Sequence, residues 1–281
     1  MSLASLVESA RERAITPRVM SIDIPKETPR YWMGGDAYTT HLLNAMSLMF
    51  PHGERMFMDA VRAYRDGLRD PRLIAQVKGF LGQEALHSRE HRTMNRWLQT
   101  LGIKADKYEE AVAEDIARQR ALRGPIDDLA VTCALEHFTA MMAQQWLTDS
   151  AFREQAAEPL RTLWTWHALE ELDHKAVAFD VYAEVGGDYL TRVRWMLVIT
   201  FRFLMSVGAF QYYLLKGDKK LAPAYLAKSW WKFWGPRGHF SKLLPTYLRY
   251  FKPGFHPWQE DDRALIAEFE RVLKAQPDLT V

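Results

Sequence analysis

The sequence is poor in cysteine, in strand patterns and in net charge. Its one cysteine among 281 residues, Cys133, cannot form an internal disulfide and fits a reducing compartment. Lysine and arginine number 37 against 35 aspartates and glutamates, so the net charge of +2 gives no reason to expect a nucleic-acid partner. Alternating apolar runs bounded by hairpin turns are nearly absent, which argues against a β fold. The first twenty residues lack a continuous apolar run, so we expect no secretory signal and a cytoplasmic location.

Helical periodicity covers most of the chain. Helices are expected over residues 36–49, 51–66, 71–101, 109–122, 127–150 and 158–185. Local signals place their ends: Pro51 in a first turn, Asp70 as an N-cap before a proline, Gly102 as a stop, and Asp127 or Asp128 as a cap. Four of these segments (51–66, 71–101, 127–150 and 158–185) suit a four-helix bundle, and the long connection between the second and third suits a ferritin-like crossover.

We therefore expect an all-α fold, a ferritin-like four-helix bundle with additional C-terminal helices. Three parts are predicted: a flexible N-terminal arm over residues 1–30, a metal-binding bundle over 31–188, and an apolar, aromatic helical extension over 189–281 that packs on the bundle.

Each of the four long segments contains a glutamate suited to pointing inward, and two of them add a histidine three residues later. These pairs are Glu84 with His87 and Glu171 with His174. Residues three apart on a helix lie on one face, so each pair can converge on one ion. Each of the other two helices contributes one carboxylate, Glu54 and Glu136. Two Glu-x-x-His pairs with two further glutamates form the ligand set of dinuclear iron or manganese carboxylate bundles.

A simpler interpretation is a polar bundle with solvated surface glutamates, since a single Glu-x-x-His is weak evidence. The coincidence favours metal, because several buried, unpaired charges would need a compensating cation. We expect two iron ions, with manganese or zinc as alternatives. His167 lies four residues before Glu171 and on the same stripe. The predicted metal-binding and catalytic residues are Glu54, Glu84, His87, Glu136, His167, Glu171 and His174.

Two families share these motifs. The pattern His167-x-x-x-Glu171-x-x-His174 resembles that of the arylamine N-oxygenase di-iron enzymes, in which the extra histidine is a third imidazole ligand. The remaining predicted ligands match that family's other positions in type, order and approximate spacing. The segments Phe-Pro-x-Gly-Glu and Glu-x-x-His, with residues 249–258, also resemble a bacterial family labelled as predicted metal-dependent hydrolases. This second resemblance covers residues 30–265, whereas the first covers only the bundle.

Three nearby residues have supporting roles in this interpretation. His91 lies four residues past His87 and could be a further ligand or a proton relay. In ferritin-like sites the residue before each Glu-x-x-His glutamate often bonds the histidine of the opposite pair. Here those residues are Gln83 and Glu170. Glu170 could instead pair with His174, four residues on, but the spacing of Glu84 and His87 favours Glu171 as the ligand.

The segment 189–216 is apolar over nearly a membrane-spanning length, but Arg202 at its centre disfavours a true span. Residues 229–234 and 247–252 mix aromatic side chains with cations, which is typical of membrane interfaces. Three roles stay open: peripheral contact with the inner face of a membrane through 189–258, packing on the bundle or on a second copy in a homodimer, or a roof over a substrate channel.

Three functions are open at this point. The leading hypothesis is an oxygenase or oxidase that uses two iron ions, O₂ and an electron donor to oxidise a small hydrophobic substrate. The alternative is a metal-dependent hydrolase with a metal-activated water. The third is a non-catalytic metal-binding or membrane-associated helical protein.

Overall fold

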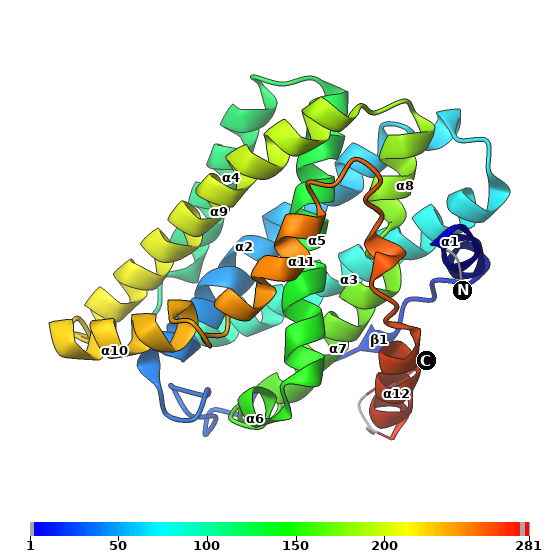
Figure 1. The fold of residues 1–281 in the computed structure, drawn as a ribbon. Helices are drawn as coiled ribbons and strands as arrows, with labels where there is room; N and C mark the ends of the chain where they lie inside the picture. The colour runs from blue at the N-terminus through cyan, green and yellow to red at the C-terminus, as the bar shows by residue number, and fades with distance from the viewer. Residues whose placement is uncertain (1–2, 276–278, 281) are drawn as a thin grey trace.

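The computed structural model describes residues 3–275 and 279–280, and it confirms the all-α prediction (Figure 1). Its α-helices are α1 (Leu3–Arg11), α2 (Ala37–Arg62), α3 (Pro71–Thr100), α4 (Ala105–Arg120), α5 (Pro125–Thr148), α6 (Ser150–Arg153), α7 (Leu160–His174), α8 (Val177–Glu184), α9 (Tyr189–Gly217), α10 (Pro223–Trp234), α11 (Leu244–Arg249) and α12 (Arg263–Lys274). Short 3₁₀ turns lie at Arg65–Gly67, Ser241–Leu243 and Pro257–Gln259, and strands β1 (Val19–Met20) and β2 (Leu279–Thr280) pair antiparallel.

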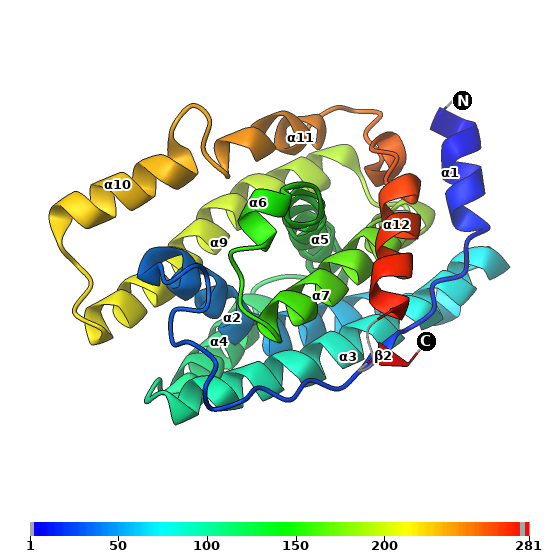
Figure 2. The ribbon, with the colours of Figure 1, turned by 90° about the horizontal axis from the view of Figure 1, so that it is seen from below.

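Four helices form the centre of the molecule. Helix α2 packs against α3 and α5, and α7 packs against α3 and α5 (Figure 2). Helix α4 links α3 to α5, as expected for the long connection. The C-terminal α9 lies against α2 and α5 on the outside. Two expectations stay predictions: the four central helices form a ferritin-like bundle, and the chain divides at residues 30 and 188.

The prediction of two helices separated at Pro51 is wrong: α2 is continuous, with Pro51 in its interior. A proline has no N–H, so the carbonyl four residues earlier loses its helical partner. That carbonyl belongs to Ser47, and the Asn95 side chain on α3 donates to it at 3.1 Å. A hydrogen bond from the neighbouring helix therefore replaces the one that proline removes.

Other helix ends match the prediction in part. Asp70 caps α3 by accepting from the backbone N–H of Arg72, and Gly102 follows α3 with a φ of +82°. The predicted cap of α5 is wrong: Gly124 is its N-cap, and Asp128 instead pairs with arginines that include Arg123. The expected helix over 158–185 is two helices, α7 and α8, separated after His174. The final helix, α12, begins at Arg263 and ends at Lys274.

Residues 13–24, which we name the N-terminal strap, lie along α3. Two glycines inside α3 permit this contact: a Cβ at Gly79 would lie 2.7 Å from the Cβ of Ile15, and one at Gly82 would lie 2.5 Å from Pro17. Both distances are far below van der Waals contact, so side chains at these positions would displace the strap. The strap carries Arg18 to a buried position over α7.

Helix α9 packs on the bundle with one face only. Its buried residues recur at helical spacing, from Arg192 through Met196 and Ile199 to Val207 and Leu214. Among the described residues, α9 is the one helix long and apolar enough to cross a membrane by length and composition, and 17% of its most apolar window is buried.

Candidate metal centre

The centre of the bundle contains seven buried carboxylate and imidazole side chains, contributed by four helices. Helix α2 supplies one, α3 two, α5 one and α7 three, in the order Glu54, Glu84, His87, Glu136, His167, Glu171 and His174. These are the seven residues predicted from the sequence. The structure brings all of them together, while their role as ligands stays a prediction.

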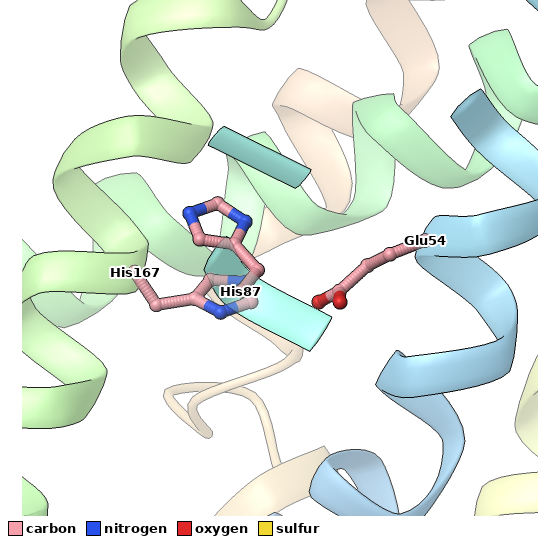
Figure 3. A group of neighbouring side chains, drawn as sticks. All are labelled: Glu54, His87 and His167. Carbon is pink, nitrogen blue, oxygen red and sulfur yellow. The ribbon is translucent and has the colours of Figure 1, made fainter. Parts of the chain in front are cut away.

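The ligand atoms form two neighbouring groups. Glu54, His87 and His167 present nitrogen and oxygen atoms within 4.8 Å of one another, and so do Glu84, Glu171 and His174. Figure 3 shows Glu54 of α2 pointing toward the two imidazoles of the first group. The remaining carboxylate, Glu136 of α5, lies beside the second group.

Contacts join the two groups into one cluster. The Nδ1 atom of His87 lies 3.9 Å from Glu84 Oε1 and 3.6 Å from Glu171 Oε1. The Nε2 atom of His174 lies 3.1 Å from Glu84 Oε1 and 3.5 Å from Glu136 Oε2. Glu84 and Glu171 therefore lie between the histidines, where a carboxylate can bridge two ions.

Many polar atoms of this cluster are buried without a hydrogen bond. Among the residues that the structure describes, they are Glu54 Oε1, both oxygens of Glu84 and of Glu136, both nitrogens of His87, Glu170 Oε2, Glu171 Oε2 and His174 Nε2. Buried polar atoms are nearly always paired, so this concentration requires a partner. Four carboxylates match the charge of two divalent cations, and the oxygen-rich donor set suits iron or manganese. The residues present therefore fit a dinuclear metal site.

The ionisation of the cluster supports this conclusion. Burial and the neighbouring glutamates raise the pKa of Glu54 and of Glu136 well above the usual range, and burial raises the pKa of Glu84 to about 7. Burial favours the neutral form of Glu171 as well, but His167 and His174 beside it outweigh burial and hold its pKa well below the usual range. Without a cation, the protein can keep only part of this cluster ionised.

Two residues orient the histidines of the Glu-x-x-His pairs in the predicted arrangement. His174 Nδ1 donates to Gln83 Oε1 at 2.9 Å, so the Nε2 atom of this ring faces the carboxylates. His87 Nε2 lies 3.1 Å from Glu170 Oε2 without forming a hydrogen bond, and this contact leaves Nδ1 facing the cluster. Glu170 thus contacts His87, whereas the choice of Glu171 for the ligand set stays a prediction.

The third histidine, His167, is oriented by a longer chain of hydrogen bonds. The Ser47 hydroxyl donates to Asn95 Oδ1 at 2.9 Å, so it accepts from His91 Nδ1, also at 2.9 Å. His91 Nε2 must then accept from His167 Nδ1, 2.8 Å away. The Nε2 atom of His167 consequently faces Glu171 Oε1 at 3.0 Å. His91 lies outside both ligand groups and positions His167.

Sequence reasoning missed the residues that hold Gln83 and Glu170. The amide of Gln83 donates to Asp173 Oδ2 at 3.1 Å. Arg18 of the strap pairs with the same oxygen at 2.9 Å, and its backbone N–H donates to Glu170 Oε1 at 2.8 Å. Asp173 directly precedes the predicted ligand His174, so its place in the sequence could have marked it as a candidate to support the site. Arg18 has no local signal, because it lies 152 residues from Glu170.

Two apolar cavities reach the cluster. A cavity of about 60 Å³ is lined by α2, α5, α7 and the segment after α9, and it contacts His167 and Glu171. A larger one, of about 460 Å³, lies between α2, α4, α5 and α9 and contacts Glu54. The larger volume falls within the ~300–1,000 Å³ range of small-molecule sites.

A family model described as "Predicted metal-dependent hydrolase" matches residues 16–261 of the chain. No curated protein matches the chain. No solved structure matches it either.

Proposed function

The chain belongs to the family of predicted metal-dependent hydrolases, and on this basis we propose that it is an enzyme with two divalent metal ions that hydrolyses an apolar substrate. The observation that carries the proposal is the set of unpaired carboxylate and imidazole atoms in the bundle centre, beside an apolar cavity. Bound divalent ions would lower the pKa of a water molecule and polarise an ester or amide carbonyl.

The side chains of the protein have distinct parts in this proposal. Glu84, Glu136 and Glu171 would hold the ions between the helices, together with the three histidines. Glu54 faces the larger cavity, where Ser88 donates to its Oε2 at 2.8 Å and leaves Oε1 unpaired. The unpaired Oε1 of Glu54 would therefore be available either to hold an ion or to accept a proton beside the bound substrate. The apolar walls of the cavity exclude bulk water and select apolar groups.

Oxidation by O₂ is the second candidate, and the donor set favours it. Four carboxylates and three imidazoles suit a redox-active metal such as iron better than a zinc site, which is usually four-coordinate and closed when structural. Iron in this site would supply the electrons for O₂ reduction that side chains cannot supply. The substrate would again be small and apolar, and an external electron donor would be required.

One experiment distinguishes the two functions. The protein, loaded separately with Fe²⁺, Mn²⁺ and Zn²⁺, is assayed against p-nitrophenyl esters of increasing acyl length and, in the Fe²⁺ form, for O₂ consumption. Ester hydrolysis supported by Zn²⁺ or Mn²⁺ and lost in Glu84→Ala supports the hydrolase. Rapid O₂ consumption with no hydrolysis supports the oxidase, and tight metal binding with neither activity supports a non-catalytic role.

A further inference from the structure

Positive charge is concentrated in the C-terminal part of the chain. Residues 189–258, which we name the C-terminal face, contain 12 of the 37 lysines and arginines and only one of the 35 acidic residues, Asp218. These 70 residues thus have a formal net charge of +11, whereas the other 211 residues have a charge of −9. The near-neutral total conceals a strongly basic segment.

The same segment presents most of the exposed apolar surface. Of the eighteen large hydrophobic side chains that are exposed within the described residues, fourteen belong to the C-terminal face. Phe201 and Leu190 of this set are 69% and 74% exposed, and Trp230 and Trp231 are 53% and 62% exposed. Helix α10 and the end of α9 lie at the opposite end of the molecule from α1 and α12 in both views (Figures 1 and 2).

Helix α9 is apolar on its outer side as well as on the side that packs on the bundle. Its central arginine, Arg202, pairs with Asp115 of α4 at 2.7 Å, so it is bound to the bundle and not left among the exposed apolar residues. A helix fixed along the bundle in this way lies parallel to any surface that it contacts. Exposed tryptophans with lysines and arginines beside them are typical of segments that lie at the lipid headgroup level.

The apolar face continues into the larger cavity. Phe203, Met205 and Phe210 of α9 line this cavity, and Met205 is 58% exposed on the outer surface. The same cavity reaches Glu54 of the metal cluster. An apolar molecule lying against α9 would therefore lie next to a largely apolar cavity that reaches Glu54.

We propose that the C-terminal face docks the protein on an anionic lipid bilayer. The basic charge of the segment complements anionic headgroups, at the position where tryptophans and leucines can enter the interface. Some cations of the segment pair with carboxylates elsewhere in the chain, such as Arg194 with Asp127 and Arg202 with Asp115, but exposed cations such as Lys228 and Arg237 have no such partner among the ion pairs of the described residues. A second copy of the chain is a poorer occupant, because these exposed cations would repel those of the other copy. Delivery of a lipophilic substrate from the bilayer into the cavity also rests on the proposed function, whereas docking itself does not.

Vesicle flotation tests the proposal with the full chain, without metal or substrate. We expect the protein to float with vesicles of phosphatidylcholine and about 30% phosphatidylserine, and to bind at least tenfold more weakly to phosphatidylcholine alone or in 0.5 M NaCl. Two exposed cations are reversed in Lys228→Glu/Arg237→Glu, and two exposed rings are removed in Trp230→Ser/Trp231→Ser. Each double variant should lower the affinity about tenfold or more.

Control variants make comparable changes of charge and apolar surface elsewhere on the protein. Lys26→Glu/Lys78→Glu reverses two exposed cations outside the C-terminal face, and Leu122→Ser removes an 83% exposed apolar side chain. Both controls should float like the wild type. Absence of flotation, equal loss in the controls, or a wild-type dimer in solution that the tryptophan variant dissociates would overturn the proposal. Metal content and hydrolysis, measured on the same variants, report on the proposed function separately.

Discussion

Replacing Gly79 with alanine should detach the N-terminal strap from α3. The new Cβ would lie 2.7 Å from Ile15 Cβ, closer than any folded structure tolerates, and the nearby backbone of the strap leaves no room. Displacing the strap exposes Ile15 and separates Arg18 from Glu170 and Asp173, all of which are buried.

The magnitude follows from these losses. Exposing Ile15 costs about 2 kcal/mol, and leaving the carboxylates of Glu170 and Asp173 buried without Arg18 costs about 3–5 kcal/mol. The better helix propensity of alanine returns about 1 kcal/mol, so the net loss is about 4–6 kcal/mol.

Urea unfolding of the metal-free protein measures this difference. Gly208→Ala is the matched control, because Gly208 also lies inside a helix and a Cβ there meets nothing within 4 Å. We expect the control variant to be more stable than the wild type by up to about 1 kcal/mol. If Gly79→Ala unfolded within about 1 kcal/mol of that control, the strap would not be held by the contacts described here.

Three further predictions concern the site. Asn95→Ala leaves the Ser47 carbonyl unpaired above Pro51 and should lower the free energy of unfolding by about 1–3 kcal/mol in urea, with no loss expected for the exposed Gln99→Ala on the same helix. Metal binding should weaken as the pH falls, because metal ions need ionised carboxylates and burial raises the pKa of Glu84 to about 7. Dye competition at pH 8 and pH 6 should show about a tenfold loss of metal affinity from this group alone, and equal affinities would contradict the assignment. Ser206→Trp should fill part of the larger cavity and lower activity toward the longest ester of the series by about tenfold while sparing the shortest; unchanged chain-length preference would place the substrate elsewhere.

Local periodicity explains how much of the site could be predicted. The residues Glu84 and His87 lie on one face of α3 wherever that helix begins, and the same holds for His167, Glu171 and His174 on α7. Errors in helix ends therefore did not affect which side chains meet. The contacts of Gln83 and Glu170 with the opposite histidines were expected from the resemblance to ferritin-like sites.

Long-range contacts explain the rest. Pro51 predicted a helix boundary because proline removes a local hydrogen bond, and the compensating Asn95 lies 44 residues later in the chain. The strap over Gly79 depends on backbone proximity between segments far apart in sequence, which no local pattern encodes. The orientation of His167 through His91 and Ser47 likewise needs α2 beside α3.

Metal analysis of the purified protein tests the central claim most directly. The account predicts about two transition-metal ions per folded chain after loading with Fe²⁺ or Mn²⁺ and desalting. In Glu84→Ala/His174→Ala we expect at most about one ion, with Glu110→Gln, an exposed carboxylate on α4, retaining the wild-type content. A folded wild-type protein that retained almost no metal, or the same content as the double variant, would contradict the assignment of this cluster as a dinuclear metal centre.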